Sequence, residues 1–117
     1  NPKREFLFVD ELAEACIFIM NLEKKEFANK VSNTSSHVNI GTGNDCSIAE
    51  LASTIKKIVG YEGRLIYDKS KPDGTPRKML DVSLINDLGW NSKISLETGL
   101  KKTYSWYRKN ISDARYN

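Results

Sequence analysis

A strand, a tight turn and a helix are predicted over residues 37–60, and this unit constrains the fold more than any other part of the chain. Apolar and polar side chains alternate over residues 38–40, which is typical of a short strand. Gly41 and Gly43 follow, and glycine adopts the backbone angles of a tight turn at the least cost. A strand followed so closely by a helix indicates an α/β fold.

The helix of this unit has a start signal, a stop signal and one apolar face. Ser47 and Glu50 have the spacing of a capping box, which predicts a helix over residues 48–59. Gly60 stands where a left-handed residue ends many helices. Six apolar residues recur at helical spacing and predict one buried face: Ile48, Leu51, Ala52, Ile55, Ile58 and Val59.

The two glycines are interpreted as a structural turn rather than as a cofactor loop. A dinucleotide-binding fingerprint needs a third glycine, and that position holds Cys46. Asp45 would also place a negative charge beside a bound pyrophosphate. The acidic residue that binds ribose is expected about 20 residues further on, where Asp68 is too weakly placed to supply it. No cofactor-binding residue is therefore assigned in this chain.

Length and composition limit the class of protein. The 117 residues are enough for one domain with a hydrophobic core, so we treat residues 1–117 as a single domain and expect residues 111–117 to be a frayed tail. Lys and Arg number 18 against 15 Asp and Glu, a net charge of +3 that permits an anionic ligand without indicating nucleic acid. Cys16 and Cys46 fit neither a metal site nor a disulfide framework, and no apolar run is long enough to cross a membrane. These features favour a cytoplasmic protein without a metal.

A second helix is expected after Asp10, which has the character of an N-cap. From Leu12 to Leu22 the sequence is apolar on nearly every side. A helix without a polar face must be covered on several sides, and this chain has few elements to cover it. We therefore expect uncovered apolar surface on this helix, and protein outside this sequence that packs against it.

Caps and turn residues predict the other elements: a helix end and surface loop over residues 23–36, a strand over residues 64–67, a loop over residues 69–78, a short helix from Asp81 or Ser83 to Gly89, and a last helix from Ser95 with Gly99 at a close approach.

Cationic side chains carry the only sign of a ligand site. Arg4 precedes an expected strand and Arg64 begins another. A loop stiffened by two prolines holds Lys69, Lys71, Arg77 and Lys78. If these segments converge, their guanidinium and ammonium groups form a pocket for phosphate. A solvated charged surface explains the same residues, and both interpretations stay open at this point.

Catalytic groups are not recognised in this chain. His37 is the only histidine and has no nucleophile beside it in the sequence, so it is interpreted as a structural residue. The carboxylates form no recognisable acid–base pair, and no tyrosine–lysine reductase pair is assigned. The sequence offers residues for binding without residues for reaction.

Four short motifs, at residues 4–13, 39–43, 71–78 and 88–90, together resemble a known family. The first and last occur in many nucleotide-sugar epimerases and dehydratases, and the run Lys-Pro-Asp-Gly-Thr-Pro-Arg-Lys at residues 71–78 is the specific one. Over nearly its whole length the chain is similar to the C-terminal part of the GDP-L-fucose synthases. These are extended short-chain dehydrogenases of the NAD-dependent epimerase/dehydratase family. Phe8 departs from the family pattern, which often has histidine there.

The resemblance implies a small α/β substrate-binding lobe of short strands and helices, without the N-terminal Rossmann domain. The family's enzyme is an oxidoreductase and isomerase. It converts GDP-4-keto-6-deoxy-D-mannose to GDP-L-fucose by 3,5-epimerisation and NADPH-dependent 4-reduction. NADP(H) and the catalytic residues would then belong to the N-terminal domain, so this chain alone is expected to be inactive. A homodimeric full enzyme is also implied.

The resemblance also gives roles to the cations. Arg4 matches a diphosphate-binding arginine, Arg64 matches a nucleotide contact, and the loop from Lys71 to Lys78 matches the wall over the GDP end of the substrate. Two alternatives remain. One is a fragment of another nucleotide-sugar epimerase or dehydratase that uses UDP or dTDP, and the other is a freestanding module that binds a phosphorylated or acidic partner.

Overall fold

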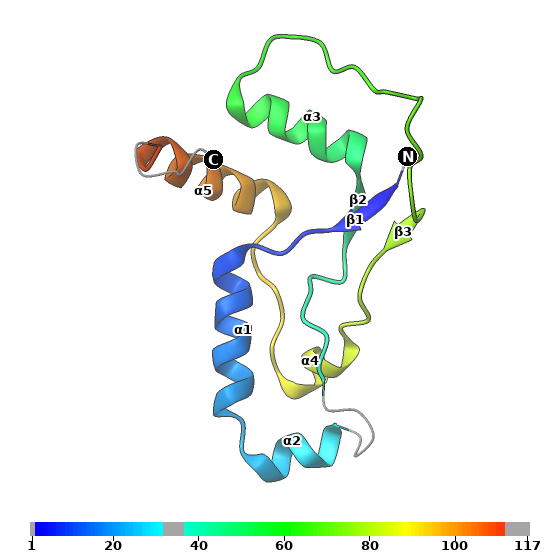
Figure 1. Cartoon of the computed structure of the whole chain (residues 1–117). Coiled ribbons are helices and arrows are strands. Elements are labelled where there is room, and N and C mark those ends of the chain that lie inside the picture. Colours follow the sequence, from blue (N-terminus) through cyan, green and yellow to red (C-terminus); the bar gives the residue numbers. More distant parts are fainter. Residues whose placement is uncertain (1, 32–36, 112–117) are drawn as a thin grey trace.

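The computed structural model describes residues 2–31 and 37–111 of the 117. Helices and short strands alternate along the described chain (Figure 1). In order they are β1 (Lys3–Glu5), α1 (Val9–Asn21), α2 (Lys24–Lys30), β2 (Asp45–Ser47), α3 (Ile48–Val59), β3 (Arg77–Lys78), α4 (Ser83–Leu88) and α5 (Leu96–Lys109). The expected α/β class is confirmed.

A three-stranded sheet in the order β2-β1-β3 lies between two groups of helices. β1 runs antiparallel to β2, with Arg4 opposite Cys46, and parallel to β3, with Arg4 opposite Lys78. Paired residues project to the same face of a sheet, so these three residues form one row across it. α3 and α5 lie together near one end of the sheet, and α1, α2 and α4 extend away from the other end (Figure 1).

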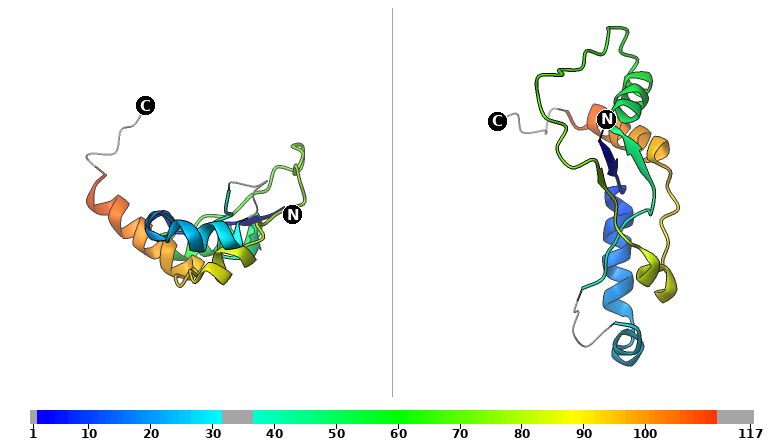
Figure 2. Two further views of the ribbon diagram at one scale, coloured as in Figure 1. Left: turned by 90° about the horizontal axis from the view of Figure 1, so that it is seen from below. Right: turned by 90° about the vertical axis from the view of Figure 1, so that its right-hand side faces the viewer.

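The core is small and lies between α1 and α4. Ala15 and Ile85 are fully buried, and Trp90 is nearly so. Partly buried apolar side chains surround them: Leu7, Phe18, Ile19, Val38, Ile40 and Val82. The radius of gyration is 17.7 Å, whereas about 13 Å is expected for a compact domain of this length. The molecule is therefore an elongated, thin body (Figure 2).

α3 has the ends that its sequence predicts. The Ser47 hydroxyl oxygen accepts a hydrogen bond from the N–H of Glu50 at 3.1 Å, and the Glu50 carboxylate accepts one from the N–H of Ser47 at 2.8 Å. Gly60 ends the helix in the left-handed conformation, with φ of 71°. The capping box and the C-terminal stop are both confirmed.

α4 and α5 also agree with the sequence prediction. α4 ends at Gly89, which has φ of 110°, and Ser95 caps α5 by accepting a hydrogen bond from the N–H of Thr98. Gly99 is buried, and a Cβ atom added there would lie 3.4 Å from Cβ of Phe8. The expected close approach at Gly99 is therefore present.

The strands expected at residues 38–40 and 64–67 are wrong. Residues 38–40 pair with no other strand. Val38 and Ile40 nevertheless pack against the core, as the alternation of apolar and polar side chains suggests. The strand of this region is β2, because residues 45–47 lie along the edge that β1 offers. Residues 64–67 stay in the loop between α3 and β3, where Ile66 is 89% exposed. Alternation reports which side chains are buried, but a strand also needs a partner.

Two helix boundaries differ from the prediction. α1 begins at Val9 after Phe8, and Asp10 lies in the first turn rather than at the N-cap, where its charge suits the helix dipole. The loop expected after residue 23 contains α2, whose Lys, Glu and Ala residues have high helix propensity. Lys30 donates a hydrogen bond to the carbonyl of Asp87 at 2.6 Å and so ties α2 to the end of α4. The expected frayed tail at 111–117 lies, after Ile111, outside the described residues.

α1 carries the uncovered apolar surface that its sequence predicts. Leu12, Ile17 and Met20 are 43%, 60% and 83% exposed, and Cys16 is exposed with them. The opposite side of the helix buries Glu11 and Ala15. Among the described helices, none is long and apolar enough to span a membrane.

Candidate functional site

The junction of β1 and β3 brings together two of the four predicted site residues. Arg4 and Lys78 are paired in register across the parallel strands. The Nη1 atom of Arg4 donates hydrogen bonds to the carbonyls of Lys3 at 2.6 Å and Thr75 at 2.8 Å. These bonds hold the guanidinium against the loop at residues 71–78. Within residues 2–31 and 37–111, no partner is bonded to the Lys78 ammonium or to Nε and Nη2 of Arg4.

An open hollow of about 550 Å³ lies beside this pair. Its lining combines two cations with apolar side chains and the glycine turn: Arg4, Glu5, Leu7, Ile40, Gly41, Lys78, Met79 and Leu80. Arginine and lysine supply charge-assisted hydrogen bonds to phosphate oxygens. An apolar wall beside them suits the body of an organic phosphate.

The other two predicted residues lie apart from this pair. Lys71 lines a second hollow of about 610 Å³ between the long α3–β3 loop and the start of α3. Pro2 lines it too, so the second hollow adjoins β1 near Arg4. Arg64 is exposed in the long loop and lines neither hollow. The structure thus pairs Arg4 with Lys78, places Lys71 nearby and leaves Arg64 separate; their ligand roles stay predictions.

Tyr67 and Lys71 have the spacing of a tyrosine–lysine reductase pair, which the sequence analysis above did not count. Both residues line the second hollow. They lie in an irregular loop, whereas a helix is what brings residues four apart onto one face. No reductase role is assigned to them.

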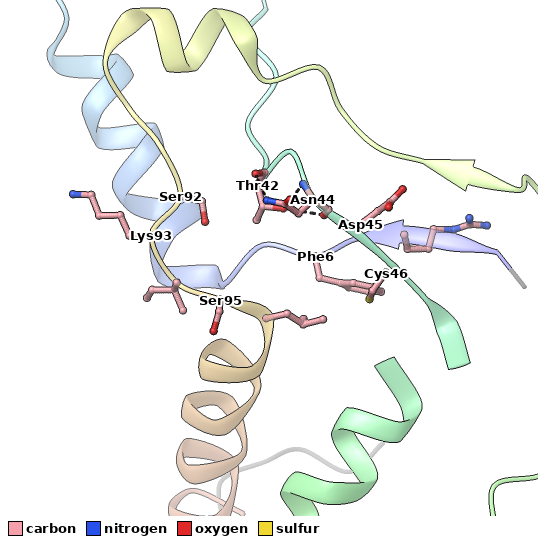
Figure 3. A pocket seen from close by; sticks show the side chains of 11 residues that line it. Phe6, Thr42, Asn44, Asp45, Cys46, Ser92, Lys93 and Ser95 are labelled. Atoms are coloured by element: carbon pink, nitrogen blue, oxygen red, sulfur yellow. Dashed lines mark hydrogen bonds between the residues drawn. The ribbon is translucent and has the colours of Figure 1, made fainter. Parts of the chain in front are cut away.

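Arg4 also lines a third hollow of about 400 Å³, in which polar and apolar side chains are mixed (Figure 3). Thr42 and Asn44 reach it from the glycine turn, and Ser92, Lys93 and Ser95 reach it from the chain that leads into α5. Within the turn, the Thr42 hydroxyl donates a hydrogen bond to the carbonyl of Asn44 at 3.0 Å.

The glycine turn is fixed by Glu5, a role that the sequence analysis missed. Oε1 of Glu5 accepts hydrogen bonds from the N–H groups of Thr42 at 2.6 Å and Gly43 at 2.7 Å, and Oε2 accepts one from the N–H of Leu80 at 2.9 Å. A Cβ atom on Gly41 would lie 2.5 Å from Oε1, so a larger residue there would displace the Glu5 carboxylate. The amides that a dinucleotide loop would present to a phosphate are bonded to a carboxylate of this chain. The turn therefore does not fit NADP(H), and the structural interpretation is supported.

Arg77 belongs to the loop at residues 71–78, but its side chain is not available for a ligand. It forms an ion pair with Asp45, whose side chain is only 6% exposed. Because Asp45 lies on β2 and Arg77 on β3, the pair crosses the middle strand β1. The pair holds the two outer strands together over the sheet.

Glu11 is a second buried carboxylate that the sequence analysis missed. It accepts hydrogen bonds from the Ser92 hydroxyl at 2.7 Å and from the N–H groups of Lys93 at 2.5 Å and Ile94 at 2.9 Å. Burial raises the pKa of Glu11. The hydrogen bonds and the charge of Lys102 together lower it by more than burial raises it, so the pKa lies below its ordinary value. Glu5 and Glu11 both belong to the first family motif, and that membership is the signal that could have pointed to them.

Other reactive groups are few in the described part of the chain. It holds no cluster of three or more metal-ligating side chains. Cys46 is unpaired and half-buried, and burial together with the charges of Glu50 and Asp45 raises the pKa of its thiol. A raised pKa makes the reactive thiolate scarce near neutral pH.

Comparison with known proteins decides the relationship. No family model matches the chain. It is 53% identical over 109 residues to the GDP-L-fucose synthase of Escherichia coli (strain K12), a match that covers 93% of this chain and 34% of that protein. The chain is a homologue of the GDP-L-fucose synthases. It spans about a third of the length of this curated relative.

Solved structures agree with the GDP-L-fucose synthase relationship. A GDP-6-OMe-4-keto-L-xylo-heptose reductase from C. jejuni has a TM-score of 0.81 and 39% identity, over 94% of this chain and 32% of its own. A GDP-mannoheptose C4 reductase from Campylobacter jejuni, solved with NADP bound, has a TM-score of 0.75 and 41% identity, over 92% and 32%. These reductases share the fold of this chain over about a third of their own length.

Proposed function

We propose that this chain is the GDP-sugar-binding part of a GDP-L-fucose synthase, which makes GDP-L-fucose from GDP-4-keto-6-deoxy-D-mannose by 3,5-epimerisation and NADPH-dependent reduction. The observation that carries the proposal is the 53% identity to the E. coli enzyme across 93% of this chain. The pairing of Arg4 with Lys78 beside an open hollow supports it.

Each predicted cation has a role in this proposal. Arg4 binds the diphosphate through the guanidinium nitrogens that its own carbonyl contacts leave free, and Lys78 adds a point charge beside it. Lys71 and Arg64 contact the nucleotide end of the substrate. The described residues supply binding and orientation for the reacting sugar, and no proton donor or hydride carrier is assigned to them.

The remainder of the enzyme supplies the reaction in this proposal. NADP(H) binds to an N-terminal Rossmann domain and delivers the hydride, and that domain also carries the catalytic residues. Its surface covers the apolar side of α1, where Ile17 and Met20 are exposed. We also infer a homodimeric enzyme that acts in the cytoplasm, and the unpaired Cys16 and Cys46 fit a reducing compartment.

Another GDP-sugar substrate is the second candidate. Two GDP-heptose reductases have the same lobe, so the sugar handled by this chain's enzyme can differ from the fucose precursor while the GDP end stays the same. These relatives are GDP-sugar enzymes, which favours GDP over UDP or dTDP, and over a freestanding module for acidic partners.

A chimera tests the proposal. The 109 matching residues of the E. coli enzyme are replaced by those of this chain, and NADPH oxidation is followed with GDP-4-keto-6-deoxy-D-mannose. We expect the chimera to form GDP-L-fucose. A chimera that binds NADPH normally, and is therefore folded, but neither binds GDP nor turns over any GDP-keto sugar would contradict the proposal. The isolated chain is expected to leave NADPH unoxidised, because Glu5 holds the amides of its glycine turn.

A further inference from the structure

We infer that Glu5 is a positioning residue for the diphosphate site: it holds the chain after β3 against β1, so that Lys78 stays beside Arg4. This inference rests on the proposed function. It concerns a carboxylate at the wall of the same hollow that acts on the ligand by positioning Lys78.

β3 needs such help because it is very short. Only Arg77 and Lys78 pair with β1, and the N–H of Lys3 adds a hydrogen bond to the carbonyl of Pro76 at 2.8 Å. Beyond Lys78 the ladder ends. The N–H of Leu80 then bonds to the Glu5 carboxylate at 2.9 Å, so a side chain of β1 continues the pairing that the backbone has stopped.

The other oxygen of Glu5 fixes the carboxylate itself. It accepts hydrogen bonds from the N–H groups of Thr42 and Gly43. Gly41 has no Cβ atom and lets the turn approach this closely. The carboxylate is therefore a fixed point, bonded on one side to the glycine turn and on the other to the segment after Lys78.

This arrangement also keeps Glu5 from neutralising the site. Glu5 lines the same hollow as Arg4 and Lys78, but both of its carboxylate oxygens accept hydrogen bonds from backbone N–H groups. The groups bonded to Glu5 are neutral donors, and within the described chain no ion pair joins it to Arg4 or Lys78. An acidic residue next to the diphosphate arginine thus stabilises the site without taking its charge.

Two pairs of variants separate this role from general stability. Glu5→Gln keeps an acceptor for the glycine turn but places an NH₂ group, which cannot accept, toward Leu80. Its control is Glu14→Gln, an exposed change on α1. Leu80→Pro removes the N–H donor without touching Glu5, and Leu80→Ala keeps that donor as its control. The second pair keeps the inference testable if Glu5→Gln does not fold.

The experiment combines amide hydrogen exchange with calorimetric titration of GDP into the 117-residue chain. In Glu5→Gln we expect at least tenfold faster exchange at Leu80, with little change at Thr42 and Gly43. GDP binding should weaken about threefold to tenfold, the cost of one side chain that is no longer pre-ordered, while the melting temperature stays close to that of Glu14→Gln. Leu80→Pro should weaken GDP binding likewise and Leu80→Ala should not.

The outcomes are distinguishable. GDP binding by the wild-type chain with unchanged affinity in both Glu5→Gln and Leu80→Pro overturns the inference alone. Slow exchange at Leu80 in Glu5→Gln overturns it as well, because the bond would then not hold this segment. A wild-type chain that binds no GDP overturns the proposed site, and the inference fails with it.

Discussion

The N–H of Lys93 donates a hydrogen bond of 2.5 Å to the Glu11 carboxylate, across 82 residues of sequence. Ile94 and Ser92 bond to the same carboxylate, which is only 4% exposed. The bonds fix the segment that leads into α5 against the first turns of α1. One charged side chain thus determines where two helices meet.

Stability should therefore fall in acid through Glu11. Its pKa is lowered in the folded chain, so its contribution is present above the ordinary glutamate pKa of about 4.3 and is lost as the pH falls through the lower folded value. Glu11→Gln should lose part of this acid dependence, and Glu14→Gln should keep it. Urea unfolding between about pH 7 and pH 3 measures the difference. Equal acid dependence in the wild type and Glu11→Gln would show that other carboxylates cause it.

Glu11→Ala should be strongly destabilising at neutral pH. It leaves the partly buried N–H groups of Lys93 and Ile94 without their acceptor, which costs about 2–4 kcal/mol of unfolding free energy. Glu14→Ala on the exposed side of α1 is the matched control. A loss below about 1 kcal/mol would mean that water replaces the carboxylate as acceptor.

Ser47→Ala should cost about 1 kcal/mol of unfolding free energy, the usual loss on removing an N-cap side chain. Ser47 accepts the N–H of Glu50, and alanine cannot. Ser53→Ala, an exposed change inside the same helix, should be neutral or slightly stabilising because alanine is the better helix former. Chemical denaturation of both variants makes the comparison. Equal stabilities of Ser47→Ala and Ser53→Ala would show that the Ser47 cap does not stabilise α3.

Arg4→Ala should weaken nucleotide-sugar binding by about 1.5–3 kcal/mol, the scale of a charge-assisted hydrogen bond. The exposed Lys25→Ala on α2 removes one positive charge far from β1 and should leave binding unchanged. Titration of GDP at rising salt concentration checks both, since exposed charges are screened within about 10 Å at 0.1 M ionic strength. Equal affinities of the two variants would exclude Arg4 from the site.

Met20→Lys should reduce self-association of the isolated chain. Met20 is 83% exposed beside Ile17 on α1, and exposed apolar patches of this kind attract protein. Asn21→Lys adds the same charge on the same helix without removing apolar surface. Sedimentation velocity compares them over a range of concentrations. A wild-type chain that is monomeric throughout that range would argue against the apolar side of α1 as a binding face.

Local signals in the sequence predicted the helices better than the strands. Ser47, Glu50 and Gly60 act within a few residues of one another, so α3 is found with its ends correct. Strands depend on distant partners: β1 is paired with residues that lie about 40 and 75 positions further along the chain, and no local pattern states this. That is why the alternation at residues 38–40 marked core packing but not a ladder.

The sequence likewise indicated some residues of the candidate site and missed others. Cation type and the family motif placed Arg4 and Lys78 together, and the register of β1 and β3 agrees with that placement. Glu5 and Glu11 were missed because a carboxylate has no special pattern until its donors are known, and those donors lie between 37 and 83 residues away. Arg64 was grouped with the others through the family resemblance and through an expected strand, and that strand does not form.

The long separation between β1 and its partners sets the order of events during synthesis. β1 and the first turn of α1 leave the ribosome well before the segments at residues 76–80 and 92–94 that bind them. α3 can form as soon as its own caps have emerged, whereas the sheet must wait for contacts of long sequence separation, which form slowly. During that interval the apolar side chains of α1 are open to chaperones and to other nascent chains.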